Sequence, residues 1–164
     1  MHEFHSIAHF IEHLGTMHAK EAMALRHGLK HAAEIVEKQA KAEIGNYQQA
    51  IADFPAWAEL AENTKEDRVS KGFTENDPLS RTGGLRDSIT HEVEGLEAVI
   101  GSESPIALYQ ELGTATIPPR SFLGTALASK QSQVVKLIGE HAVGALIEGR
   151  PFSYLPPGFS ESKY

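Results

Sequence analysis

The stretch SITHEVEGLEAVIGS, residues 88–102, decides the fold of this chain. Apolar and polar residues alternate on both sides of Gly95-Leu96, first in ITHEVE and then in EAVIG. Alternation with a period of two is typical of strands, and a glycine-containing turn between two such runs is typical of a hairpin. We therefore predict two short antiparallel strands joined at Gly95-Leu96.

Two helical patterns follow this hairpin. Ser104-Pro105 offers an N-cap followed by proline at the first helical position, and Gly113 stands where a left-handed residue ends a helix. The segment PIALYQEL between them is therefore predicted to be a short helix. ATIPPR is expected to be extended, because the residue before a proline is kept out of the α region. Apolar spacing then predicts a long amphipathic helix from Ser121 to about Ile147.

The chain before the hairpin begins with a third helical pattern, whose apolar residues recur at three- and four-residue spacing. They are Phe4, Ile7, Ile11, Leu14, Leu25, Leu29, Ala32, Val36 and Ala40. Gly15-Thr16 is expected to divide this region into a short piece and a longer helix over about 17–43, with Thr16 as N-cap and Gly45 as the stop. The pattern fades over 46–81, which predicts a long connection with a short helical turn near Trp57.

These elements predict a single α+β domain with a long N-terminal helix, a small antiparallel hairpin sheet, a short helix and a long C-terminal helix. We divide the chain into a His-rich extension at 1–16, the domain at 17–148, and a Pro- and aromatic-rich tail at 149–164. A lone hairpin is marginal in water. Two long helices can cover one face of it but leave its edges unpaired, so we predict a homo-oligomer.

Composition excludes several classes of protein. A length of 164 residues suits one domain, and the absence of cysteine excludes disulfides, thiolate nucleophiles and cysteine zinc motifs. No apolar run is long enough to span a membrane, and the first residues lack the pattern of a signal peptide. We therefore expect synthesis in a cytoplasm and no membrane partner. The net charge of -7 disfavours tight binding to nucleic acid.

The negative charge is concentrated between Asp87 and Pro119, a segment with six acidic residues and no Lys or Arg. Within it, Glu92 and Glu94 alternate along the first predicted strand, which places both side chains on one face. The ordinary interpretation is a solvated charged surface. The alternative is a surface that repels a polyanion such as DNA.

Nine histidines offer the main candidate for metal chemistry. On a straight helix, most of those near the N-terminus form a stripe opposite the apolar one, with His18 on the apolar side. The stripe comprises His2, His5, His9, His13, His27 and His31. HFIEH at 9–13 also has the H-x-x-E-H order of one class of zinc peptidase, with Glu12 in position to activate water. No third ligand is evident, so we expect exposed imidazoles, with no metal, no cofactor and no catalytic residue.

Other catalytic motifs are missing from the sequence. TGGLRDS lacks the lysine of a phosphate-binding loop, and there is no G-x-S-x-G and no G-x-G-x-x-G after a strand. The remaining distinctive phrases are PLSRTGGLRDSI at 78–89, VIGSESPIALYQELGT at 99–114 and IPPRSFLGTAL at 117–127.

In the first of these phrases, Thr82 is expected to cap a turn, and Gly83-Gly84 to let this turn approach the hairpin closely. Leu85 is expected to fill the core. In the second, we expect Tyr109 and Leu112 to pack inward.

Glu111 lies near a helix end where a carboxylate needs a partner, and Arg86 and Arg120 are the available ones. We therefore expect an ion pair that stabilises the fold. Phe122 and Leu123 are expected to anchor the last helix.

In order and spacing, these phrases resemble the tail-completion or head-to-tail joining proteins of tailed phages and prophages. This group includes the Mu-type virion-morphogenesis proteins and the family of the lambda minor tail protein Z. Such proteins carry T-G-x-L-R-x-S-I, then a V-G-S strand, a Y-x-x-E-x-G-T helix end and a P-x-R-x-F-L helix start. PAWAELAENT is similar to the W-x-x-L-x-x-x-T phrase of the Mu-type members.

The resemblance covers about 17–148 and departs at Ser121, where a proline is common, and at both termini. The matching positions are Gly84, Leu85, Arg86, Ser88, Gly101, Tyr109, Glu111, Gly113, Thr114, Pro119, Arg120, Phe122 and Leu123.

The resemblance implies a structural, non-enzymatic subunit of the virion at the head-proximal end of the tail or in the neck. It implies a ring that contacts tail terminator, tail tube or head-closure subunits and passes DNA without holding it. Glu92 and Glu94 would then face the lumen. Two alternatives stay open: a zinc hydrolase that uses HFIEH, and a small dimeric partner-binding module.

Overall fold

The computed structural model describes the backbone of residues 7–148 and the side chains of residues 15–16 and 19–144. Its elements in chain order are α1 (Ile7–Glu43), α2 (Glu62–Ser70), α3 (Gly84–Asp87), β1 (Ile89–Glu94), β2 (Glu97–Ser102), α4 (Pro105–Leu112) and α5 (Leu123–Glu148). The mixed α+β architecture with two long helices and one hairpin is the predicted one. No helix within 7–148 is both long and apolar enough to cross a membrane.

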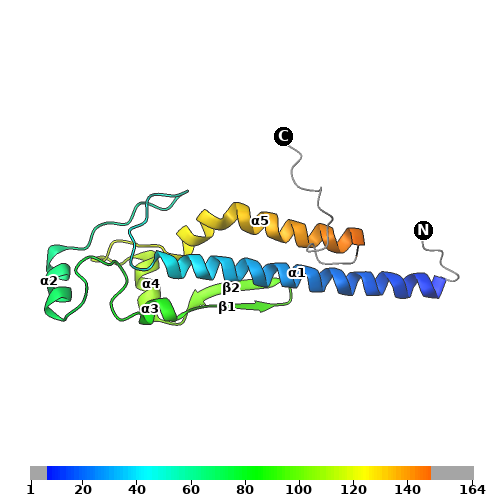
Figure 1. Cartoon of the computed structure of the whole chain (residues 1–164), viewed down its shortest axis with the longest axis horizontal. Coiled ribbons are helices and arrows are strands. Elements are labelled where there is room, and N and C mark those ends of the chain that lie inside the picture. The colour runs from blue at the N-terminus through cyan, green and yellow to red at the C-terminus, as the bar shows by residue number, and fades with distance from the viewer. Residues whose placement is uncertain (1–6, 149–164) are drawn as a thin grey trace.

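Helix α1 forms the middle layer of the molecule, with the hairpin on one side and α5 on the other (Figure 1). The expectation that both long helices cover one face of the hairpin is therefore wrong, because only α1 lies against it. The sequence of α1 explains this arrangement. Ala32 and Ala33 are both buried, and adjacent residues of a helix point in different directions, so the helix has a packing surface on two sides.

The predicted break at Gly15-Thr16 is wrong, because α1 continues through both residues. A glycine inside a helix costs only about 1 kcal/mol relative to alanine, and no proline accompanies it here. The predicted end is confirmed: α1 stops at Glu43 and Gly45 has a φ of +98°. The Gly45 amide donates to the carbonyl of Pro78 at 2.8 Å, which returns the long loop to the end of this helix.

The hairpin has the predicted turn, since β1 pairs antiparallel with β2 from Ile89↔Ser102 to Glu94↔Glu97. Ile89 is fully buried, and His91 and Val93 follow it on the side that faces α1. The opposite side, here called the outer hairpin face, consists of Thr90, Glu92, Glu94, Glu97 and Val99, all exposed. Among the described residues no third strand joins this sheet, so both of its edges are unpaired.

The connection over 46–81 contains α2 in place of the predicted turn near Trp57. Trp57 itself lies in non-helical chain and is buried. Helix α2, ENTKEDRVS, is polar almost throughout, so it leaves no apolar periodicity in the sequence. Arg68 fixes it to the rest of the loop, donating from Nε to the carbonyl of Thr74 at 2.7 Å and from Nη2 to that of Ser80 at 2.6 Å.

The core lies where the C-terminal half of α1 meets the start of the hairpin, α4 and the start of α5. Its buried members are Val36, Ala40, Ile44, Trp57, Ile89, Ala107, Phe122 and Ala126. Leu85 and Leu123 pack against this cluster while staying partly exposed. The core positions predicted for Leu85, Phe122 and Leu123 are thus confirmed, and the phrases singled out in the sequence converge on this end of the molecule.

Candidate functional site

Glu111 connects α4 to the N-terminus of α5. Its carboxylate accepts the backbone N–H of Phe122 at 2.8 Å, of Leu123 at 3.0 Å and of Gly124 at 2.9 Å. It also accepts the hydroxyl of Ser121. A helix N-terminus presents free N–H groups and a partial positive charge, so a carboxylate there is strongly favoured. The expected ion pair of Glu111 with an arginine is therefore wrong, because backbone amides are its partners.

Arg120 binds the long loop instead of Glu111. Its Nη2 donates to the carbonyls of Ala58 at 2.9 Å and Glu59 at 3.2 Å, and its Nε donates to that of Ala58 at 3.1 Å. Burial lowers the pKa of this guanidinium from its ordinary value. The buried group is nevertheless satisfied by three hydrogen bonds to two backbone carbonyls. Arg86, the other expected partner of Glu111, is exposed and lies 3.5 Å from Asp87.

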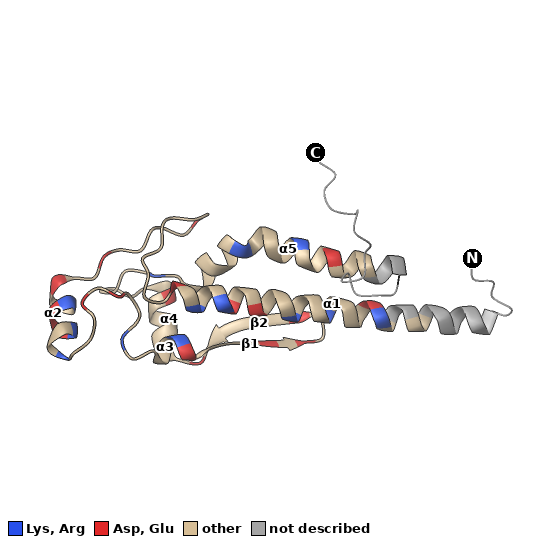
Figure 2. Ribbon diagram, viewed as in Figure 1, with Lys and Arg blue, Asp and Glu red and all other residues tan. Residues whose placement is uncertain are grey.

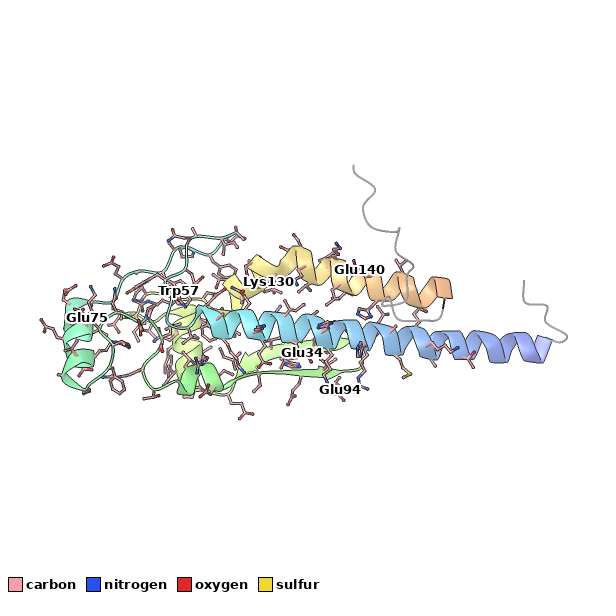
Figure 3. All side chains as sticks on the ribbon, in the orientation of Figure 1. Glu34, Trp57, Glu75, Glu94, Lys130 and Glu140 are labelled. Carbon is pink, nitrogen blue, oxygen red and sulfur yellow. The ribbon has the colours of Figure 1, made fainter. Side chains whose placement is uncertain are left out.

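The same loop is held a second time by Trp57 (Figure 3), which donates its indole N–H to the carbonyl of Ser121 at 3.1 Å. Ser121 and Arg120 are neighbours in the chain. Two consecutive residues before α5 therefore fasten a loop that lies more than 60 residues earlier in the sequence. The segment around Pro119 and the loop that contains Trp57 are thus held together by hydrogen bonds although they are distant in the sequence.

Gly113 ends α4 with a φ of +76°, so the predicted positive-φ stop is confirmed, although its ψ of 176° is extended and not left-handed helical. A Cβ at this position would lie 2.9 Å from the carbonyl oxygen of Ile117 and 2.9 Å from the nitrogen of Pro119. The Thr114 hydroxyl accepts the amide of Ile117 at 3.1 Å within the same turn. Only glycine fits both the dihedral angle and the space.

The first phrase forms the entry to the hairpin. The Ser88 hydroxyl donates to the carbonyl of Leu85 at 2.8 Å and lies 2.7 Å from the hydroxyl of Ser102, the last residue of β2. Gly84 begins α3, and Gly101 pairs with Thr90 with open space around it. These positions shape the end of the sheet that meets the core.

The glycine pair at the start of α3 has a different role from the expected one. Gly83 has a φ of +83°, and added Cβ atoms at Gly83 and Gly84 would meet only Asp87 and Thr82, not the hairpin. Thr82 contacts the amide of Gly84 at a long 3.4 Å, and Gly83 occupies the N-cap position. The requirement at this turn is therefore conformational freedom and not close approach to the sheet.

A buried carboxylate that the sequence did not indicate lies beside this junction. Glu43, at the end of α1, accepts the Thr125 hydroxyl at 2.5 Å and the Gln39 amide at 3.1 Å. Burial raises the pKa of Glu43, and the charge of Glu111 adds to the increase. Because Glu43 has the last α1 position and Thr125 lies in the first turn of α5, this bond fixes one helix against the other.

The expected inward packing of Tyr109 and Leu112 is wrong. Tyr109 is 51% exposed and Leu112 is 70% exposed. Only Ala107 of α4 is buried, because the Glu111 side of this short helix already faces α5. The larger apolar side chains of α4 therefore remain on the surface beside the junction.

An open groove of about 580 Å³ lies next to α4. Ile106 and Gln110 of α4 form one wall, and the loop around Leu60 and Leu79 and the turn at Ile117 form others. The side-chain oxygen Oε1 of Gln110 is buried, and no described residue donates a hydrogen bond to it.

The outer hairpin face carries negative charge without compensation. Both strands of the hairpin contain acidic residues and no Lys or Arg (Figure 2). Glu92, Glu94 and Glu97 form no ion pair with any residue in the described part of the chain. The shared face predicted for Glu92 and Glu94 is confirmed. On the inner face, His91 instead pairs with Glu37 of α1, which lowers the pKa of that carboxyl.

The histidines do not form a metal centre in the described region, where no group of three or more His, Asp or Glu side chains could hold an ion. His27 and His31 are exposed as predicted. The side chains of HFIEH and of His18 lie outside those described, as do His2 and His5. His141 of α5 is buried, with its ring centroid 5.8 Å from that of His27.

No protein-family model, curated protein or solved structure matches this chain. A functional proposal therefore rests on the geometry and on the resemblance of the sequence phrases. The resembling phrases supply a helix cap, a loop clamp and a glycine turn, and none of them brings a nucleophile, an acid and a base to one cleft. Beside them lie an uncharged apolar helix surface and an acidic sheet face.

Proposed function

We propose that this chain is a non-enzymatic structural subunit of a phage or prophage virion. It would close the head-proximal end of the tail, or join tail to head in the neck, as a ring of identical copies. Its neighbours would be tail terminator, tail tube or head-closure subunits. The basis for naming this assembly is the resemblance of the phrases at 78–89, 99–114 and 117–127.

The observation that carries the proposal is the contrast between two sets of residues at one end of the molecule. Glu111, Gly113 and Arg120 are fully engaged in holding the fold together. Next to them, Leu108 and Leu112 are more than half exposed. Clustered exposed apolar side chains mark surfaces that bind other proteins, as an assembly subunit requires.

The outer hairpin face supports passage of DNA without binding. A channel for a genome must not hold phosphates, and each lysine or arginine in it adds a phosphate contact. Glu92, Glu94 and Glu97 lie on one exposed face that has no basic residue. Repeated around a ring, this face would repel DNA at short range. We place it at the lumen or at its mouth.

The experiment is to delete the gene from a phage or prophage that carries it, and to complement the deletion with the intact chain. Loss of the protein should leave filled heads and separate tails, visible by electron microscopy, with plaque formation restored by complementation. Mass spectrometry of purified wild-type particles should detect the chain. Infectious particles that lack the protein, from either strain, would overturn the proposal.

A further inference from the structure

The exposed apolar residues of α4 form a regular stripe. Pro105, Leu108, Tyr109 and Leu112 are spaced at i, i+3, i+4 and i+7, so they lie along one side of the helix. Leu108, Tyr109 and Leu112 are 58%, 51% and 70% exposed. This spacing is the one by which a helix inserts into an apolar groove of a partner. We call these four residues the α4 stripe.

A groove that suits such a helix lies on the same chain. Its volume is about 580 Å³, and its walls include the apolar side chains of Leu60, Leu79, Leu85, Ile106 and Ile117. Four charged residues, Glu59, Arg68, Arg81 and Arg120, also line it. Pockets of several hundred Å³ hold drug-sized ligands, which are comparable in size to a few large side chains. The groove is partly open to the surface.

The stripe and the groove are adjacent, because α4 contributes to both. Ile106 and Gln110 line the groove, while Leu108 and Leu112 lie on the exposed side of the same helix. A contact in which the stripe of each copy enters the groove of the other uses the same two surfaces on both copies. Such self-complementary surfaces produce a two-fold contact, in which each residue pair occurs twice.

We propose that two copies of this chain pair about a two-fold axis, with the α4 stripe of each packed into the groove of the other. The occupant of the groove is thus a second copy of the chain. This contact is independent of the hairpin edges, which stay free for other neighbours. An assembly built from such pairs contains an even number of copies.

Charge favours a second copy at this face over others of the molecule. Each copy has a net charge of -7, so two copies repel wherever their acidic surfaces meet. The α4 stripe contains no ionisable side chain other than the phenol of Tyr109. The one carboxylate of α4, Glu111, is turned toward α5 and occupied by backbone amides. Contact through α4 therefore avoids like-charge repulsion at its centre.

The available area is also consistent with a stable pair. Large apolar side chains that are half exposed or more each offer on the order of 100 Å². The stripe together with Ile106, which is 55% exposed, therefore offers roughly 400 to 500 Å². A standard interface buries about 800 Å² per partner, a little over half of it apolar. The stripe and the groove rim together reach that range.

Sedimentation velocity of the purified, untagged chain tests the pairing directly. The wild-type chain should be dimeric at tens of micromolar or below, as roughly expected for an interface of this size. Leu108→Ala/Leu112→Ala should weaken the dimer by at least about tenfold, because it removes from both copies the large apolar side chains that fill the groove. Both side chains are exposed in the monomer, so circular dichroism should show an unchanged fold.

The matched control is Leu127→Ala/Val135→Ala on α5. These residues are 50% and 65% exposed, and the substitution removes apolar side chains of similar size away from α4. The control should dimerise like the wild type. A wild-type chain that remains monomeric at several hundred micromolar would overturn the pairing. Equal weakening by both variants, or weakening by the control alone, would do the same.

The absence of cysteine allows a second test that identifies the contact itself. A tagged Leu112→Cys chain is mixed with an untagged Thr116→Cys chain, so that a disulfide between them would link a stripe residue to a groove residue. Under mild oxidation this mixture should form mixed disulfides at least about tenfold faster than a mixture of Val135→Cys with Thr116→Cys, because effective concentration is high only across a contact. Equal rates would overturn the proposed arrangement.

Both tests use purified protein, so they do not depend on the proposed virion role. A dimer that never enters particles would leave the pairing standing and overturn the function. A chain that is monomeric in solution but present in particles would overturn the pairing and leave the proposed function standing.

Discussion

The carboxylate of Glu111 accepts the backbone N–H of Phe122 at 2.8 Å and so caps the helix that Phe122 precedes. Phe122 is fully buried in the core, and Glu111 belongs to a different helix eleven residues earlier. The bond therefore fixes both the position of α4 and the direction in which α5 leaves the core. Hydrogen bonds to a charged acceptor contribute about 1.5 to 3 kcal/mol, more than neutral ones.

Replacement of Glu111 by alanine should lower the free energy of unfolding by about 2 to 4 kcal/mol, because several amide donors at the start of α5 lose their acceptor. Urea denaturation of the purified variant measures this loss. Glu103→Ala is the matched control, since Glu103 lies in the same acidic segment but is exposed. The control should change stability by less than about 0.5 kcal/mol. Similar losses in the two variants would show that the cap contributes little.

Replacement of Gly113 by valine should destabilise the fold by more than about 2 kcal/mol. The φ of +76° is strained for a β-branched residue, and a Cβ would contact Ile117 and Pro119 at 2.9 Å. Thermal unfolding followed by circular dichroism measures the effect. Gly139→Ala in α5 is the control, because nothing lies within 4 Å of a Cβ there and alanine favours a helix. A melting temperature of Gly113→Val equal to that of the wild type would contradict the assigned turn.

The elements that the sequence predicted well have signals within a few residues. The hairpin was predictable because side chains alternate on both sides of Gly95, and α4 because Ser104-Pro105 and Gly113 mark its ends. These patterns reflect local backbone preferences, which operate before any tertiary contact forms. The end of α1 near Gly45 belongs to the same class.

The side-chain placements that the sequence predicted badly depend on partners far away in the chain. Helix spacing alone places Tyr109 and Leu112 on an apolar stripe but does not say whether that stripe faces the core. Glu111 has arginines nearby in the sequence, yet backbone amides satisfy it. The buried Glu43 depends on Thr125, 82 residues later. Such pairings arise from the packing of α1 against α5, which has no local signature.

His141 should make stability depend on pH. Burial lowers its pKa from the ordinary value of 6.5, and the nearby His27 and His31 lower it further, whereas Glu140 opposes them. The folded chain therefore binds a proton less readily than the unfolded chain. Its contribution to stability is present above pH 6.5 and is lost as the pH falls from there toward the lowered pKa of the folded state.

The variant His141→Leu should therefore lose less stability than the wild type between pH 7.5 and pH 5.5, roughly the range in which histidine titrates. Urea midpoints at the two pH values measure the difference. His31→Gln is the control, because His31 is exposed and should keep most of the wild-type slope. A slope in His141→Leu as steep as in the wild type would assign the pH dependence to other groups.

The last prediction concerns the outer hairpin face, where Glu94 lies near the turn and points away from α1 (Figure 3). Under the proposed function, Glu92→Lys/Glu94→Lys should fold and enter particles, because both side chains are exposed and unpaired. The new lysines attract phosphates, so DNA ejection should slow and infectivity fall, most strongly at low salt. Glu66→Lys/Glu75→Lys, at exposed sites in and after α2, makes the same change in charge and should eject normally. Incorporation is measured by mass spectrometry and release by a DNA-binding dye. Normal release at every salt concentration, with the variant present in the particles, would mean that these carboxylates are only a solvated surface.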